Sequence, residues 1–203
     1  MSTVTIDQLP PSTLAFAASP TERANGKKHV ETTLDTGKAP PNVQLSTDKA
    51  PLRIPFGLST PYGDEDGGQR HTLDVSASPE LAAWAGAIDE ALVLHAVKHS
   101  QAWFGEALDE ASVRAMHHPL MRPSDKYEPT LRLKANPKTV KLWRAADRVP
   151  IGVDELTASA AVVPVVALGN VWFLDDGRMF GLSLGMKLGL VSPSLGLDDF
   201  VFS

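Results

Sequence analysis

The stretch that most constrains the fold is Ala161–Val191, the most apolar part of this chain. Apolar and β-branched residues fill 162–168, as strands prefer, and a second extended run follows at 171–174. Residues 175–177 are Asp-Asp-Gly, which favours a tight turn because Asp and Gly accept the positive φ that hairpins require. We therefore expect a β-hairpin whose return strand runs over Met179–Leu190.

Glycines stand at every fourth position of that return strand, at Gly181, Gly185 and Gly189. Side chains alternate between the two faces of a strand, so we expect all three glycines on one face. One interpretation is a tightly coiled strand of a small, strongly curved barrel. The other is a bare face that a flat ligand can approach closely.

The length of 203 residues indicates one domain with tails. We expect a flexible arm rich in Pro, Ser and Thr over 1–40, a domain over 41–191 with a helical insertion at 78–116, and a short tail over 192–203. Cysteine is absent from the sequence, which excludes disulfides and Cys-ligated zinc. We see neither a signal-peptide pattern nor an apolar run that could span a bilayer, so we expect an intracellular protein of the cytoplasm or nucleus, without a membrane partner.

Two helices are predicted from their first residues. Ser78 is a good N-cap and Pro79 suits the first helical position, so one long helix should run to about His99. Asp109 caps a second, shorter helix over 110–116.

Histidines and carboxylates form no convincing metal site. His95 and His99 have the spacing of two helical zinc ligands, but no third ligand accompanies them, and His117-His118 suit a helix end instead. Asp64, Glu65 and Asp66 lack the remaining positions of a calcium loop. We expect neither a metal nor a cofactor.

Positive charge is concentrated between Arg114 and Arg148. This segment holds nine basic and three acidic residues, a net charge of +6 in a chain whose total is −5. Residues 130–134 alternate strictly, which predicts a strand with one apolar and one basic face, and Tyr127 and Trp143 lie among the cations. Such a strand either follows a sugar-phosphate backbone while rings stack on bases, or is a solvated edge strand whose charges block unwanted pairing.

Several segments, taken in order, resemble a known family. They are PFGLS (55–59), HTLDVS (71–76), a helix ending in WFG (103–105), HHPLMRPSDKYEPTLRLK (117–134) and VWFLDDGRMFGLSLGMKLGLV (171–191). Their order and spacing resemble the phage-type OB-fold single-stranded DNA-binding proteins, with relatives in large DNA viruses of eukaryotes. The resemblance covers roughly residues 42–191.

This resemblance implies a mainly β protein, a five-stranded Greek-key barrel with one long inserted helix and a short second helix. It implies sequence-nonspecific binding of single-stranded DNA in replication or recombination, with no enzymatic activity. The residues expected to bind nucleic acid, from the basic segment and the resemblance, are Arg122, Lys126, Tyr127, Arg132, Lys134, Lys141, Trp143, Trp172 and Phe180. Alternation in the strand leaves at most one of Trp172 and Phe173 able to stack on a base.

The resemblance also implies an acidic-aromatic tail that contacts replication proteins, formed here by Asp198, Asp199, Phe200 and Phe202. An alternative function is that of a structural or assembly component, which reuses the barrel without binding nucleic acid and which forms a homo-oligomer. An enzyme is disfavoured, because the sequence has no phosphate-binding loop, nucleophile elbow or dinucleotide fingerprint.

Overall fold

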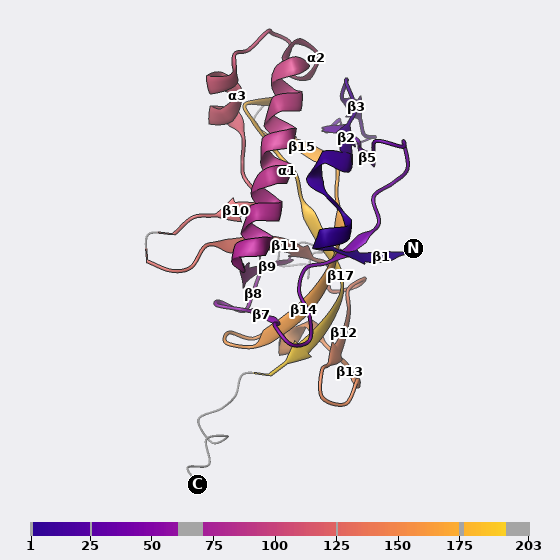
Figure 1. Cartoon of the computed structure of the whole chain (residues 1–203), viewed down its shortest axis with the longest axis vertical. Helices are drawn as coiled ribbons and strands as arrows, with labels where there is room; N and C mark the ends of the chain where they lie inside the picture. The colour runs from indigo at the N-terminus through magenta and orange to yellow at the C-terminus, as the bar shows by residue number, and fades with distance from the viewer. Residues whose placement is uncertain (1, 25, 61–70, 125, 175–176, 194–203) are drawn as a thin grey trace.

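The computed structural model describes residues 2–24, 26–60, 71–124, 126–174 and 177–193 (Figure 1). Within them the protein is mainly β, with three α-helices: α1 (Pro79–Lys98), α2 (Ser100–Phe104) and α3 (Glu110–Met116). The 3-10 turns are η1 (Ile6–Gln8), η2 (Pro11–Thr13) and η3 (Val153–Glu155). The strands are β1 (Thr3–Thr5), β2 (Leu14–Phe16), β3 (Thr21–Glu22), β4 (Lys28–Val30), β5 (Thr32–Leu34), β6 (Asn42–Gln44), β7 (Leu52–Arg53), β8 (Leu58–Ser59), β9 (His71–Ser76), β10 (Met121–Arg122), β11 (Thr130–Ala135), β12 (Lys141–Arg144), β13 (Pro150–Ile151), β14 (Ala161–Leu168), β15 (Val171–Leu174), β16 (Met179–Gly181) and β17 (Leu184–Ser192).

The main sheet has the strand order β1-β6-β14-β17-β11-β9-β8, with β7, β10, β12 and β13 attached beside this path. Its end strands, β1 and β8, do not pair with each other within the described residues, so the sheet is open. The expected closed Greek-key barrel is therefore confirmed only as a mainly β fold with helices inserted between β9 and β10.

The expected single hairpin over 161–191 is divided between two sheets. β14 pairs antiparallel with β17 in the main sheet, whereas β15 and β16 form their own hairpin. This second hairpin belongs to a four-stranded sheet of order β16-β15-β4-β3. The division falls at 169–170, where the Gly-Asn pair interrupts the outgoing strand. β15 therefore finds its outer partner, β4, in the N-terminal segment rather than in the main sheet.

The three glycines of the return strand do not share one face, contrary to our expectation. Val165 pairs with Leu188 but the next residue, Val166, pairs with Met186, so Lys187 is an extra, bulged residue in β17. A bulge of one residue reverses which side chains point inward beyond it. It also bends the strand, and β11 and β12 pair with the two halves of β17 on either side of it.

The helices begin where the sequence predicts. Ser78 Oγ accepts a hydrogen bond from the Leu81 amide at 3.2 Å, and Asp109 Oδ1 accepts one from the Ser112 amide at 2.8 Å. The long helix ends at Lys98, and the WFG segment at 103–105 ends a separate helix, α2, with Gly105 as its C-cap. α1 packs into the core, where its residues Leu81, Ile88 and Leu92 are fully buried. In Figure 1 it lies in the upper half of the molecule, while β12 and β13 lie at the opposite end.

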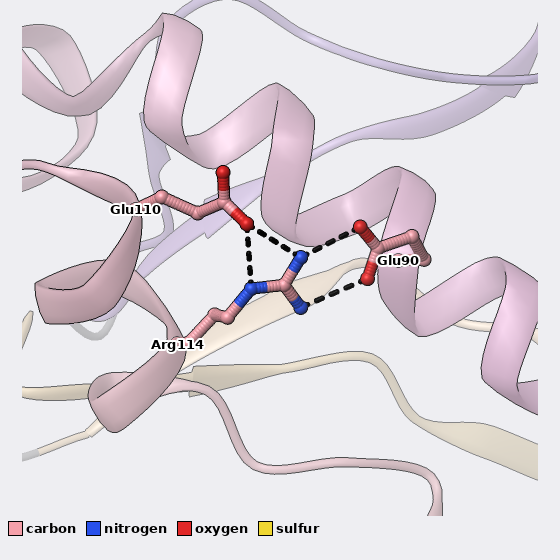
Figure 2. A network of polar contacts seen from close by, with 3 residues as sticks. All are labelled: Glu90, Glu110 and Arg114. Carbon is pink, nitrogen blue, oxygen red and sulfur yellow. Dashed lines mark hydrogen bonds and ion pairs between the residues drawn. The ribbon is translucent and has the colours of Figure 1, made fainter.

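An ion-pair network joins α1 to α3 (Figure 2). Arg114 on α3 donates from both terminal guanidinium nitrogens to Glu90 on α1, at 2.8 and 2.6 Å. It also contacts Glu110, one turn earlier on its own helix, at 2.7 Å. These bonds raise the pKa of Arg114 and lower that of Glu90. All three side chains are about half exposed, so solvent weakens the attraction and the network adds little to stability.

The described residues of 1–40, which the sequence suggests are a flexible arm, include several that pack against the rest of the chain. Leu14, Phe16 and Val30 belong to the hydrophobic core. The Trp84 indole on α1 donates to the Leu9 carbonyl at 3.0 Å, and the Trp103 indole on α2 donates to the Ala17 carbonyl at 3.3 Å. Apolar burial and the two indole hydrogen bonds attach this segment to the helices, while the domain boundaries themselves stay a prediction.

None of the helices in the described part of the chain has the length and apolar character needed to cross a bilayer.

Candidate nucleic-acid interface

A groove of about 760 Å³ lies between the main sheet and the four-stranded sheet β16-β15-β4-β3. On one side it is bounded by the β3–β4 hairpin and by β15 and β16, and on the other by β9, β10 and β11. We call it the basic groove and define it by its cationic lining: Arg23, Lys27, Lys28, Arg122, Arg132 and Lys134, with His29, His71 and His118. No Asp or Glu occurs among the described residues that line it. A chain with a net charge of −5 thus has one groove that presents only positive and neutral side chains.

Strand β11 provides one wall, and it has the two faces that its alternation predicts. Leu131 and Leu133 are fully buried, while Arg132 is half-buried and Lys134 is exposed. The interpretation of this segment as a solvated edge strand is wrong, because β11 pairs with β9 on one side and with β10 and β17 on the other. Its charges are therefore not needed to block pairing.

Arg132 is held by a carboxylate on the neighbouring strand. The register of β9 and β11 places it directly opposite Asp74, and Nε and Nη2 donate to the two carboxylate oxygens, both at 2.7 Å. This bidentate geometry fixes the guanidinium plane. The hydrogen bonds to Asp74 raise the pKa of Arg132. Asp74 therefore orients one cation of the groove and offsets part of its charge.

Arg122 is the groove cation whose charge a bound anion would stabilise most. It lies on β10 opposite Thr130, at the same edge of the groove as Arg132. Burial lowers the pKa of Arg122, and the positive charge of Arg132 lowers it further, against the opposing effect of Asp74. An arginine remains charged despite such a shift. A phosphate bound here would relieve both the lost hydration and the repulsion between the two guanidinium groups.

Trp172 lines the groove from β15 and is held in one orientation. Its indole nitrogen donates to the Leu182 carbonyl at 3.3 Å, and its ring lies 5.8 Å from the His118 ring in an edge-to-face arrangement. Gly181 faces this ring: a Cβ at that position would come within 2.8 Å of the indole and 2.7 Å of the His118 carbonyl oxygen. The Trp172 ring of the same hairpin thus fills the space beside Gly181, and a ligand cannot approach the backbone there.

Phe180 differs from our expectation of a nucleic-acid contact, because it is completely buried. Its ring lies 5.4 Å from Phe104, 5.3 Å from His117 and 6.4 Å from Phe173. This aromatic cluster packs α2 and the end of α3 against the β15–β16 hairpin. Phe180 has no exposed face on which a base could stack.

Four other predicted residues lie outside the lining of the basic groove. Lys126 and Tyr127 are exposed in the connection between β10 and β11, and Lys141 and Trp143 lie on β12. β12 pairs with the last residues of β17 and with β13, beyond the bulge, and its charges have no place in the groove. Asp198, Asp199, Phe200 and Phe202 of the tail lie outside the described residues.

The β3–β4 hairpin is the part of the groove that sequence reasoning missed. Arg23, Lys27 and Lys28 come from it, and it reaches the groove because His29 on β4 pairs with Trp172 on β15. A local signal was present, since residues 25–26 are Asn-Gly, a favoured hairpin turn, with two lysines directly after it. In the structure Gly26 has a φ of +74°.

The two histidine rings at the end of α1 are in contact, with their planes tilted by 32°. The His95 and His99 rings lie 4.4 Å apart, beside Phe16 and Trp103. Across the described ranges, no group of three or more potential ligands of this kind gathers that could hold a metal ion.

Comparison with known proteins gives a distant likeness only. No family model matches the chain, and no curated protein sequence is similar to it. Among solved structures, the single-stranded DNA-binding protein of bacteriophage Enc34 in complex with ssDNA is 13% identical, with a TM-score of 0.42 over 90% of this chain and 98% of that one. Its C-terminal truncation gives 12% identity and a TM-score of 0.45 over 88% and 94%, and the protein without DNA gives 13% and 0.43 over 93% and 94%. A likeness at this level assigns neither the fold nor the function, so the function is inferred from the groove itself.

Proposed function

We propose that this protein binds single-stranded DNA without sequence preference, with the polynucleotide lying in the basic groove. The observation that carries the proposal is the lining itself: six Lys and Arg side chains and three histidines, with no carboxylate among the described lining residues, in a chain of net charge −5. Lysine and arginine contacts to phosphate supply most of the affinity of nonspecific binding and carry no sequence information.

The mixed character of the groove favours an unpaired strand over a duplex. Trp172, Phe173 and Leu174 line the same groove as the cations, so rings and apolar side chains lie beside phosphate-binding groups. The faces of bases in a duplex are covered by their neighbours, whereas those of a single strand are free to contact such side chains. Such an activity would serve replication or recombination, in which unpaired strands are exposed. Partner binding by the tail remains a prediction.

The test is a binding titration over a series of salt concentrations with a fluorescent oligothymidylate. The variant Lys28→Ala/Arg122→Gln removes one cation from each wall, and the glutamine retains part of the Arg122 packing. Each phosphate contact to a single strand contributes about 0.7 to the slope of log K against log salt, so this variant should flatten the slope by about 1.4.

The matched control is Lys98→Ala/Lys187→Ala, which removes the same charge from exposed positions on α1 and on the β17 bulge, outside the groove lining. It should leave the slope close to that of the parent protein. Equal losses in the two variants would mean that only overall charge matters, and the groove assignment would fail. Absence of binding by the parent protein, together with a stable DNA-indifferent assembly on size exclusion, would favour the structural alternative.

A further inference from the structure

Two large aromatic side chains project into solvent near the basic groove. Phe56 is 56% exposed and Tyr127 is 65% exposed, although they come from connections 71 positions apart in sequence. Their ring centroids lie 6.2 Å apart and their planes are nearly perpendicular, at 82°. Two exposed rings in contact offer apolar faces that a ligand can cover.

The backbone beside Phe56 is fixed. The Ile54 amide donates to the Ala160 carbonyl at 2.7 Å, and the Leu58 amide donates to the Leu156 carbonyl at 3.0 Å. Between them Gly57 has a φ of +75°, and a Cβ there would lie 3.2 Å from the Ala158 amide nitrogen. Phe56 is therefore presented by a segment attached at both ends, and its ring is not on a free loop.

The backbone beside Tyr127 forms a local turn. Ser124 Oγ accepts hydrogen bonds from the Lys126 amide at 3.3 Å and from the Tyr127 amide at 3.1 Å. The edge-to-face contact with Phe56 limits the orientation of both rings, which lowers the entropy lost when a ligand covers them. The pair is thus suited to bind a flat, apolar group.

Strand register places the aromatic pair in line with the cations of the groove. On β11, Lys134 pairs with Thr72, Arg132 with Asp74 and Thr130 with Ser76. Arg122 lies opposite Thr130, and Tyr127 precedes Thr130 by three residues.

Phe56 approaches the same end from the other side of β9. β8 pairs Leu58 with Leu73, so Phe56, two residues earlier, lies toward the Val75–Ser76 end of β9. A path along β9 and β11 from Lys134 past Arg132 and Arg122 therefore ends at the aromatic pair.

We propose that Phe56 and Tyr127 form a second base-stacking site, reached by a single strand that leaves the basic groove past Arg122. The inference rests on the proposed function and extends it, because it lengthens the bound strand beyond the groove. The charges that adjoin the pair in sequence balance, with Arg53 and Lys126 against Asp125 and Glu128. The positive charge on this path comes from Arg122 and Arg132 of the groove, which β10 and β11 bring to the Tyr127 end in register. These two cations favour a polyanion with free base faces over a purely apolar partner.

The test uses oligothymidylates of about 4 to 16 nucleotides, the range of site sizes seen in comparable single-strand binders. Phe56→Ala and Tyr127→Ala should each weaken binding of the long oligonucleotides about tenfold, the usual cost of one lost stacked base. They should weaken the shortest ones much less, and they should leave the salt slope unchanged, since no phosphate contact is removed. Tyr127→Phe should restore binding, because it keeps the ring.

Leu94→Ala is the matched control, since Leu94 is 51% exposed on α1 and lies outside the groove lining. If Lys28→Ala/Arg122→Gln weakens binding while both ring variants bind every length as the parent does, the stacking site is refuted and the groove stands. If the parent binds no oligonucleotide, both proposals fail. If the ring variants change self-association on size exclusion and not DNA binding, the pair belongs to a protein interface and the inference is overturned.

Discussion

Asp74→Asn should strengthen binding of single-stranded DNA, although it removes a well-formed ion pair. The carboxylate accepts both hydrogen bonds of Arg132 at 2.7 Å and also acts on the charge of Arg122. Asparagine keeps the shape and an acceptor oxygen but removes the negative charge. The groove would then lose one negative charge that offsets its two arginines, which is equivalent to one additional cation acting on phosphate.

The magnitude follows from counterion release. One restored cation should steepen the slope of log K against log salt by about 0.7. The ratio of variant to parent affinity should therefore be about fivefold larger at 0.1 M salt than at 1 M salt. The free energy of unfolding should fall by about 1–3 kcal/mol, because Asp74 is 12% exposed and loses one of its two charge-assisted hydrogen bonds to Arg132, which is 34% exposed.

The assay is a fluorescence anisotropy titration of an oligothymidylate at several salt concentrations, alongside urea unfolding of each protein. Asp35→Asn is the control, because it makes the same charge change at an exposed position outside the groove lining. Unchanged affinity and slope in a folded Asp74→Asn protein, or an equal gain in Asp35→Asn, would refute the assignment of Arg132 and Arg122 to phosphate binding.

Two further predictions concern the packing on which the groove depends. Phe180→Ala should lower the free energy of unfolding by about 3–5 kcal/mol in urea titrations, because it empties a fully buried aromatic site; an unchanged stability would contradict this packing. Burial lowers the pKa of His95, with His99 and Lys98 lowering it further against a hydrogen bond to Ala17 that raises it. The folded protein thus favours the neutral imidazole. The stability that this residue contributes is fully present above the pKa of the unfolded chain, near 6.5, and it is lost as the pH falls from there through the lowered pKa of the folded protein. Thermal unfolding from pH 8 to 5 should show a smaller acid-induced loss in His95→Phe than in the parent, and identical profiles would show that His95 has no such role.

The helices could be predicted because their signals are local. Ser78 and Asp109 accept the capping hydrogen bonds that their positions imply, and α3 begins and ends at the expected residues. The two-faced character of β11 is likewise contained in the alternation of a few neighbouring residues. Both kinds of signal depend only on residues a few positions apart in the sequence.

The division of the hairpin and the second wall of the groove could not be predicted in the same way. Whether β15 continues the main sheet depends on a partner, β4, that lies 143 positions away from it at the His29–Trp172 pair. The bulge at Lys187 is set by pairing with β14, and it places Gly189 on the opposite face from Gly185. Charge composition located one wall of the groove at β11 but could not show which distant cations would face it.

The most direct test of the central claim is photocross-linking of the wild-type protein to an oligonucleotide carrying 5-iodouracil, followed by peptide mapping. We expect cross-links in both walls of the basic groove, within residues 23–29 on one side and at Arg122 and 130–134 on the other, together with Trp172. Cross-links confined to β12 and β13, over 141–151, or equal labelling across the whole surface, would contradict the account.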